Sequence, residues 1–180
     1  VVGFSLVTSA LGSFQALRGP FPFAIQIPIE NLPSPLNGLK IAQISDLHVG
    51  PTIGPQYVKK VVDLVNEFNP DVIVWTGDMI DGHVDNLLSD MSYLNELKSK
   101  YGIFSVLGNH EYYWNALAWK NAQEKLSAKV LINEHVEIPF GDTKLAIIGL
   151  PDHSGGGFYK EHRPNLEKAT QGMSSGCTKI

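Results

Sequence analysis

Short apolar segments alternate with amphipathic segments through the first half of the chain. The apolar segments are rich in Val and Ile, which is typical of strands buried on both faces of a sheet, and they span residues 40–45, 71–77 and 102–108. Between them, apolar residues recur every three or four positions, which predicts helices over residues 56–68 and 86–98. Two successive strand–helix–strand units follow from this order, so we expect three parallel strands with right-handed crossovers.

The rest of the chain predicts further strands and one more helix. We expect a helix over residues 114–127, followed by strands over 129–133, 134–140 and 143–150. The last two strands are joined at Gly141-Asp142, which indicates a hairpin. Residues 22–38 begin with alternating side chains and then become rich in Pro and Gly, which favours an edge strand followed by a loop. Residues 178–180 look like the start of another strand.

Composition restricts the class of protein. The chain has 180 residues, of which 43% are hydrophobic and 18% charged, and this balance excludes a disordered chain, a highly charged coiled coil and a polytopic membrane protein. The net charge of -4 favours neither nucleic acid nor an anionic membrane surface, so any affinity for phosphate must be local. Cys177 is the only cysteine, which excludes an intramolecular disulfide and a cysteine-based zinc site.

The N-terminal segment carries no charge before Arg18. Its length lies at the lower limit of a bilayer span, and its Gly, Ser, Thr and Gln residues dilute its apolar character. Three interpretations stay open for residues 1–20: the end of a transmembrane helix, the remnant of a signal peptide, or an ordinary packed helix. We assign residues 21–180 to one truncated domain and expect the protein to be associated with a membrane, either a bacterial inner membrane or a plasma membrane.

Polar residues follow each of the three buried strands. Asp46 and His48 come after the first strand, Asp78 after the second, and Asn109 and His110 after the third. Parallel strands end at the same edge of a sheet, where open α/β sheets bind their ligands, so these side chains should converge. Carboxylates and imidazoles gathered in this way repel and desolvate one another unless a cation compensates them. The mixed oxygen and nitrogen donors suit Mn, Fe, Zn, Ni or Co.

Each motif has a simpler explanation when it is taken alone. Asp-x-His in such a loop is more often a helix cap beside an unrelated histidine, and Gly-Asp is a common turn. Gly-Asn-His-Glu has a chance expectation of roughly one in a thousand for this length. The combination is more specific, because Asp78 follows Asp46 by 32 residues and Asn109 follows Asp78 by 31, which is one strand–helix unit each.

These three motifs, with the longer stretches IAQISDLHVG, VNEFNPDVIVWTGDMIDG and VLGNHEYYW, resemble the calcineurin-like metallophosphoesterase superfamily, in particular its membrane-anchored bacterial branch. The resemblance covers residues 38–151. It implies an α/β fold, a four-layer αββα sandwich, of which this chain holds the N-terminal βαβαβ half and the strands that follow.

The resemblance also implies roles for six residues. Asp46 and His48 would bind the first of two divalent metal ions, Asp78 would bridge both, and Asn109 would bind the second. His110 would be the catalytic histidine, and Asp81 would orient it. Asp81 has a simpler alternative as a cap of the next helix.

The chain departs from the family in one respect. The family pattern continues with a strand that ends in a metal-binding histidine and then a Gly-His-x-His motif, and neither occurs in these 180 residues. We therefore interpret the sequence as holding about half of the metal ligands. His135, His153 and His162 lack the required context, and we expect them to be surface or loop histidines.

The function implied is hydrolysis of phosphomonoester, phosphodiester or lipid-linked pyrophosphate bonds by a metal-activated water, with a small phosphoester or a lipid-linked molecule, such as a UDP-diacylglucosamine-type compound, as the substrate. Two alternatives stay open, a catalytically silent metal-dependent binding module and a nuclease. The acidic balance makes nucleic acid an unfavoured partner.

Several neighbouring residues carry two interpretations each. Tyr112, Tyr113 and Trp114 either stack on a substrate or pack against their own helix. The glycine-rich loop over residues 150–157 either borders the substrate pocket or is an ordinary loop. Glu111 either accepts a hydrogen bond behind the metal ligands or begins a helix, where a carboxylate complements the helix dipole.

Overall fold

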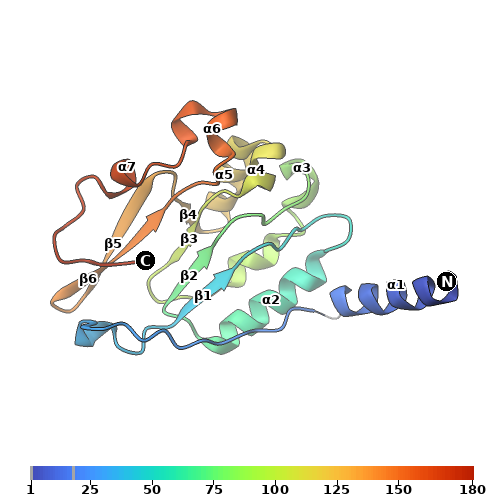
Figure 1. Cartoon of the computed structure of the whole chain (residues 1–180), viewed down its shortest axis with the longest axis horizontal. Helices are drawn as coiled ribbons and strands as arrows, with labels where there is room; N and C mark the ends of the chain where they lie inside the picture. Colours follow the sequence, from blue (N-terminus) through green and yellow to red (C-terminus); the bar gives the residue numbers. More distant parts are fainter. Residues whose placement is uncertain (1, 18) are drawn as a thin grey trace.

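Two sheets packed face to face form the centre of the protein (Figure 1). The computed structural model describes residues 2–17 and 19–180, so Val1 and Arg18 lie outside the described residues. The first sheet has four parallel strands in the order β1 to β4, which are Ile41–Ile44, Val72–Trp75, Ile103–Ser105 and Ala128–Val130. The parallel arrangement predicted for the first three strands is confirmed.

The second sheet begins with the predicted hairpin. Strands β5 (Glu134–Phe140) and β6 (Thr143–Gly149) pair antiparallel around the turn at Gly141-Asp142. A short strand, β7 (Thr178–Lys179), pairs parallel to β6, in agreement with the strand expected at the end of the sequence. The second sheet therefore has the order β5, β6, β7.

Alternation along the strands of the first sheet divides the apolar side chains between its two faces. Val72 on β2 and Phe104 on β3 face the second sheet and pack with Ile138 of β5 and Leu145 of β6. The opposite face of the first sheet, which includes Trp75, packs against the helices. Both faces of the first sheet are buried, as the Val- and Ile-rich segments predicted.

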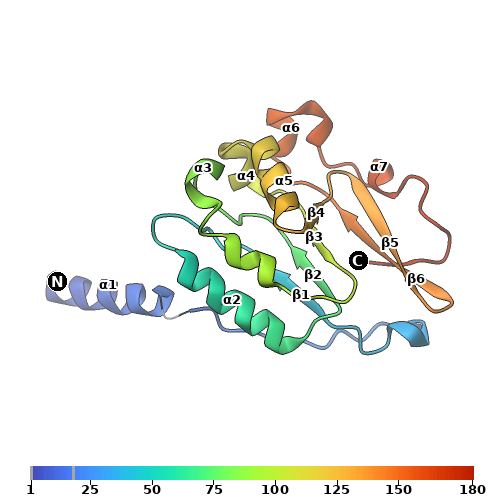
Figure 2. The ribbon, with the colours of Figure 1, turned by 180° about the vertical axis from the view of Figure 1, so that it is seen from behind.

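Helices cover the outer face of the first sheet (Figure 2). Helix α2 spans Pro55–Phe68, which agrees with the predicted helix over 56–68. The helix predicted over 114–127 is present in shorter form as α5 (Ala116–Lys125), because Asn115 in the left-handed conformation caps its start and separates it from α4 (Asn109–Tyr113).

The prediction of one long helix over residues 86–98 is wrong. In its place are a short helix, α3 (Val84–Leu87), and a 3-10 helix, η2 (Ser92–Glu96). Short polar side chains, among them Ser89 and Asp90, lie between the two and favour turns over a continuous helix. The apolar stripe on which the prediction rested is nevertheless buried, since Leu87, Met91 and Leu94 all lie in the core.

The second sheet is covered on its outer face by a short helix. In this part of the chain are α6 (Gly155–Phe158), the 3-10 helix η3 (Lys160–His162) and α7 (Leu166–Thr170). His135 of β5 bonds through Nδ1 to the carbonyl oxygen of Ala169 in α7 at 2.7 Å, on the face opposite the one that packs on the first sheet. The order is therefore helix, sheet, sheet, helix, as expected for the N-terminal part of a four-layer sandwich.

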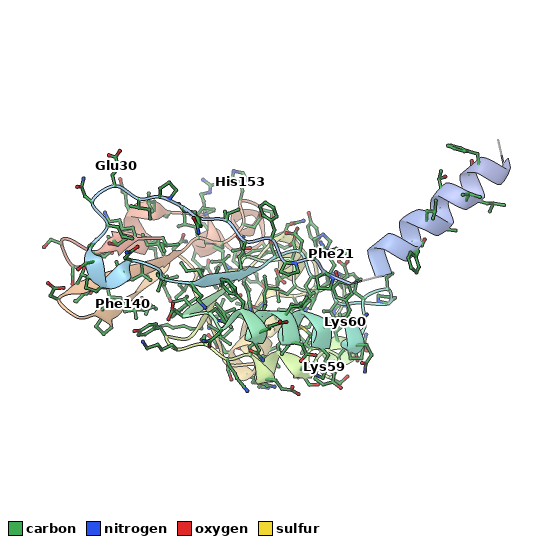
Figure 3. The ribbon with its side chains drawn as sticks, turned by 90° about the horizontal axis from the view of Figure 1, so that it is seen from below. Phe21, Glu30, Lys59, Lys60, Phe140 and His153 are labelled. Carbon is green, nitrogen blue, oxygen red and sulfur yellow. The ribbon has the colours of Figure 1, made fainter. Side chains whose placement is uncertain are left out.

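The N-terminal region departs from the predictions. Residues 22–30 form neither helix nor strand, so the predicted edge strand is wrong, and the 3-10 helix η1 (Ser34–Leu36) lies between this segment and β1. The alternating apolar side chains of this segment are exposed, and they include Phe23, Ile25, Ile27 and Ile29. Figure 3 labels Phe21 at the end of this segment nearer the first helix and Glu30 at the other end.

Helix α1 (Val2–Leu17) projects away from the two sheets (Figures 1 and 3). Its apolar side chains are exposed, among them Phe4, Leu6, Val7, Leu11 and Phe14. The exposed side chains of residues 3–14 therefore do not pack against the rest of the described structure. No helix among residues 2–17 and 19–180 has both the length and the apolar character that crossing a bilayer requires.

Candidate metal centre

The sequence motifs meet at one edge of the first sheet because the loops after β1 and β2 run side by side. Backbone hydrogen bonds continue the pairing of the two strands, from the Asp46 amide to the Gly77 carbonyl at 3.2 Å and from the His48 amide to the Asp78 carbonyl at 3.0 Å. The Asp81 amide then donates to the Val49 carbonyl at 2.8 Å. Segments about 30 positions apart in sequence are thereby placed next to each other.

The backbone at these positions is held in an uncommon conformation. Asp46, His48 and Asp78 have φ values of 54°, 49° and 55°, in the left-handed region that residues other than glycine seldom adopt. Such conformations cost on the order of 1 kcal/mol each and persist where the surrounding structure enforces them, often at functional sites. The parallel loop pairing supplies that enforcement.

Glycine permits the close approach of the second and third loops. A Cβ atom on Gly77 would lie 2.6 Å from the backbone of Gly108, and one on Gly108 would lie 2.5 Å from the Asp78 nitrogen and 2.9 Å from its Cγ. No side chain fits at either position. The two glycines therefore allow the Asp78 carboxylate to lie directly against the start of α4, where the His110 amide donates to Asp78 Oδ1 at 3.0 Å.

Glu111 fixes these two loops to each other. Its side chain is fully buried and accepts backbone N–H groups from Met79 at 2.8 Å, Asp78 at 3.0 Å and Gly108 at 2.8 Å. Burial raises the pKa of Glu111 above its ordinary value, although the three N–H donors act in the opposite direction. Of its two predicted roles, the structure supports hydrogen bonding behind the ligands most directly, and the residue also lies in the first turn of α4.

Three predicted site residues form a compact group. His48, Asp78 and His110 each offer a ligand atom, and these atoms lie within 4.8 Å of one another. The rings of His48 and His110 meet edge to face with centroids 4.5 Å apart. Three donors at this separation match a cation site of mixed nitrogen and oxygen ligands.

Asp81 joins the two histidines. One carboxylate oxygen bonds to Nδ1 of His110, and the other lies 3.1 Å from Nδ1 of His48. An imidazole whose Nδ1 donates to a carboxylate presents Nε2 as its remaining donor or acceptor, which is the usual arrangement of metal-binding histidines. Asp81 makes no cap hydrogen bond to α3, whose N-cap is His83, so the simpler alternative is not observed.

Asn109 provides a test of whether a cation fits. One terminal atom of its amide lies 3.2 Å from Oδ1 and 3.0 Å from Oδ2 of Asp78. When that atom is the amide nitrogen, it donates to the carboxylate; when it is the oxygen, three acceptor oxygens face one another, which is unfavourable without a cation. Hydrogen bonding alone therefore favours the nitrogen facing Asp78, whereas a divalent ion bound at Asp78 would select the orientation with the amide oxygen as a ligand.

Asp46 lies at the open side of the group. Its side chain is 68% exposed, its Oδ1 is 4.0 Å from Nε2 of His48, and its Oδ2 accepts a hydrogen bond from the Ser45 hydroxyl. Asp46 is not one of the three residues that converge within 4.8 Å. The structure thus places all six predicted site residues at one edge of the sheet, with Asp46 the most exposed of them.

The prediction for His162 is wrong, because this histidine is buried rather than on the surface. Its Nδ1 lies 2.9 Å from the hydroxyl of Tyr112, which is buried as well. Burial lowers the pKa of His162 and raises that of Tyr112. Of the other two histidines, His153 is exposed and His135 is partly exposed on the second sheet. Sequence reasoning missed the Tyr112–His162 contact because 50 residues separate the pair.

Fold and site together define an α/β protein with a candidate metal centre at the carboxyl ends of parallel strands. Residues 39–170 match the family model described as calcineurin-like phosphoesterase, and the chain belongs to this family. Members of this family are hydrolases that typically bind divalent metals. This agrees with the group formed by His48, Asp78 and His110.

The relatives are longer than this chain. A Danio rerio protein named "Transmembrane protein with metallophosphoesterase domain" is 32% identical over 174 residues, covering 94% of this chain and 40% of the relative. A Chlamydia muridarum protein named "UDP-2,3-diacylglucosamine pyrophosphatase LpxG" is 38% identical over 78 residues, covering 43% of this chain and 24% of the relative. This chain therefore spans well under half the length of these relatives.

Among solved structures, the Mycobacterium tuberculosis protein titled "Phosphopantetheinyl Hydrolase (PptH)" aligns with a TM-score of 0.39 and 16% identity, covering 62% of this chain and 42% of that one. The sequence relatives include both an animal and a bacterial protein, so they support the superfamily, and the bacterial membrane-anchored branch stays a prediction.

Proposed function

We propose that this chain belongs to a metal-dependent phosphoesterase that hydrolyses phosphomonoester, phosphodiester or lipid-linked pyrophosphate bonds at a centre of two divalent ions. The observation that carries the proposal is that two ligand candidates, His48 and Asp78, offer atoms within 4.8 Å of each other and of a ring nitrogen of His110, the candidate catalytic histidine, and that Asp81 contacts both histidines. Hydrolysis of a phosphate ester requires that the negative charge on the phosphoryl group be neutralised. The chain has a net charge of -4, so its overall charge does not supply this neutralisation.

Four residues would hold the ions. Asp46 and His48 would bind the first, Asp78 would contact both, and Asn109 would bind the second through its amide oxygen. Bound divalent ions supply a water of lowered pKa and neutralise charge on the phosphoryl oxygens. These 180 residues contain no Gly-His-x-His motif, so the four residues would supply part of the ligand set that the family resemblance implies.

His110 would handle the proton of the leaving group. Its Nδ1 is occupied by Asp81, so Nε2 is the atom left to donate a proton to the leaving oxygen. Asp81 would keep the ring in that orientation through its contact with Nδ1. Asp81 acts through the histidines and is therefore a positioning residue.

The apolar N-terminal region supports a substrate or product at a membrane surface. Helix α1 exposes apolar side chains and carries no charge in its sequence. One of the two relatives is named as a transmembrane protein and the other as a UDP-2,3-diacylglucosamine pyrophosphatase. We propose membrane association through residues 2–17, and a pyrophosphate or phosphoester attached to a lipid as the substrate class.

Replacing Asp78 by Asn in the full-length protein tests the hydrolytic function. With Mn²⁺ present and an aryl phosphodiester as substrate, we expect turnover to fall by at least about 100-fold, because removing a charged metal contact misplaces the reacting groups. The matched control is Asp63→Asn on α2, which removes an exposed carboxylate paired with Lys59. Turnover of the Asp78 variant near that of the control would contradict the proposal.

Two further results would each favour a different function over the proposed one. Mn²⁺ binding without turnover of any phosphoester by the wild-type protein would favour a binding module. Cleavage of single-stranded DNA, with no turnover of small phosphoesters, would favour a nuclease. Binding to phosphatidylcholine vesicles, compared with and without residues 2–17, tests the membrane association separately; equal binding would contradict it.

A further inference from the structure

Two exposed aromatic side chains lie next to the candidate metal centre. Tyr113, at the end of α4, has its ring centroid 5.6 Å from that of His110. Phe158, at the end of α6, lies 6.1 Å from Tyr113 with the ring planes at 56°. The side chains are 58% and 51% exposed, respectively. We call Tyr113 and Phe158 the aromatic pair.

The neighbouring residue Tyr112 has a different role. It is buried, and its hydroxyl bonds to the buried His162 at 2.9 Å. Its ring also contacts that of Phe158 at a centroid distance of 5.7 Å. Of the two interpretations predicted for this run of aromatic residues, packing therefore holds for Tyr112, whereas Tyr113 presents its ring to the outside beside His110.

The segment that carries Phe158 is anchored to the metal centre. The Asp152 amide donates to the carbonyl of Leu107, which directly precedes Gly108, at 2.9 Å. The Asp152 carboxylate in turn accepts the Ser154 amide at 2.8 Å. Figures 1 and 2 both place α6 against α4. The glycine-rich loop is thus tied to the strand end that supplies Asn109 and His110.

Close packing also fixes α6 in position. A Cβ atom on Gly155 would lie 2.7 Å from the ring and hydroxyl of Tyr112, so the first turn of α6 lies directly on that buried side chain. By contrast, a Cβ atom on Gly157 would have no neighbouring atom within 4 Å, because this glycine lies on the open side of the turn. The position of Phe158 is therefore set by buried contacts, while its own ring stays exposed.

We propose that the aromatic pair is a binding subsite for an aromatic group on the leaving-group side of the substrate. This inference rests on the proposed function, in which His110 protonates the leaving oxygen. A group attached to that oxygen would extend past His110 onto Tyr113, the exposed ring that contacts it. Two rings tilted to each other offer one face and one edge to a third ring, the arrangements that aromatic groups favour.

The exposure of the aromatic pair contrasts with its surroundings, because the neighbouring side chains of Tyr112 and His162 are buried. Tyr112 and the segment through His162 already supply the packing that holds α4 and α6 together. About half of each of the two rings nevertheless remains exposed, and a flat ligand would cover both. An aryl group and a nucleobase share this chemistry.

The test compares an aromatic ligand with a saturated ligand of similar size. Phenylphosphonate and cyclohexylphosphonate are titrated into the full-length protein with Mn²⁺, and binding is followed by calorimetry. We expect wild-type protein to prefer phenylphosphonate, and Tyr113→Leu and Phe158→Leu each to weaken phenylphosphonate by about two- to ten-fold with little change for cyclohexylphosphonate. The matched control is Phe68→Leu, an exposed aromatic residue (42%) at the end of α2.

The outcomes separate this inference from the proposed function. Equal weakening of both phosphonates, no weakening, or no binding of phenylphosphonate overturns the subsite. Mn²⁺ affinity should be unchanged in both leucine variants, because neither side chain belongs to the donor set. Turnover of an aryl phosphodiester is measured separately. A protein that shows no turnover would contradict the hydrolytic proposal, whereas the calorimetric affinities for the two phosphonates would still test the subsite.

Discussion

The Asp81 carboxylate bonds to Nδ1 of His110 through one oxygen and lies 3.1 Å from Nδ1 of His48 through the other. The family resemblance implied the first contact only. The second contact means that one carboxylate orients both a metal-ligand candidate and the candidate catalytic histidine, so a change at Asp81 should alter metal binding and turnover together.

Replacing Asp81 by Asn tests that double role. The amide can offer its oxygen to one histidine only, and its NH₂ group then faces the other. We expect Mn²⁺ affinity and turnover each to fall by about 10- to 100-fold. Calorimetric titration with Mn²⁺ and an aryl phosphodiester assay measure the two effects, with Asp85→Asn on the exposed face of α3 as the control. A variant that loses turnover but keeps its Mn²⁺ affinity would show that Asp81 serves His110 alone.

Glu111 is expected to stabilise the fold through its three backbone contacts. Glu111→Ala leaves three buried N–H groups without their acceptor, and each such group costs about 1 to 3 kcal/mol. Relaxation of the surrounding structure and the removal of a buried charge offset part of the cost of these unpaired N–H groups. We therefore expect the free energy of unfolding, measured in urea, to fall by about 2 to 4 kcal/mol. Glu111→Gln should lose less, since its amide oxygen still accepts. The exposed Glu124→Ala, paired only with Lys120, is the control, and a loss equal to that of the control would refute the assignment.

Gly108→Ala is expected to displace Asp78. The added Cβ would lie 2.5 Å from the Asp78 nitrogen and 2.9 Å from its Cγ, so one of the two loops must move. A misplacement on the order of 1 Å can reduce turnover by about 100-fold, and Mn²⁺ affinity should fall as well. Gly54→Ala, where no atom lies within 4 Å, is the control. Wild-type turnover in the Gly108 variant would show that the close approach is not required.

Removing metal from the protein should lower its thermal stability. An ion that binds only the folded state contributes about 2.7 kcal/mol when its concentration is 100 times its Kd. Addition of EDTA should therefore lower the Tm of wild-type protein that is saturated with Mn²⁺. The Asp78→Asn variant should show little change under the same treatment. Equal shifts in the two proteins would indicate that the ion binds at another position.

Glu137 gives a pH dependence away from the metal centre. Hydrogen bonds from Lys144 and then Ser174 lower the pKa of the Glu137 carboxyl from 4.5 to about 2. Because the folded-state pKa is the lower one, Glu137 stabilises the protein above pH 4.5, and this contribution is lost as the pH falls toward 2. The Tm difference between wild type and Glu137→Gln should therefore be largest near pH 7 and shrink by about pH 3. A Tm difference that stays constant between pH 7 and pH 3 would contradict the assignment.

The sequence alone was enough to predict which residues meet at the sheet edge. Each motif directly follows a Val- and Ile-rich strand, so parallel pairing brings Asp46, Asp78 and Asn109 to one edge whatever the details of the loops. The shared contact of Asp81 with His48 was beyond this reasoning, because it depends on the backbone pairing of the two loops after the strands end.

The errors in the fold have similar causes. The apolar stripe of Leu87, Met91 and Leu94 was interpreted as one helix, although the buried stripe is carried by two short elements. Alternation over residues 22–30 predicted a strand, yet a strand also needs a partner, which the local pattern cannot reveal. The burial of His162 likewise depends on Tyr112, a residue distant in sequence.

The spacing of the ligand loops has a consequence for how the protein folds. A chain in which only β1 and β2 had paired would bring together Asp46, His48 and Asp78, but His110 and Asn109 arrive only with β3 and α4. Closing each loop of about 30 residues costs entropy before any metal contact can repay it. Tight binding of an ion at this site would therefore come late in folding, and a growing chain that has not yet docked its third strand would compete poorly for ions with proteins that are already folded.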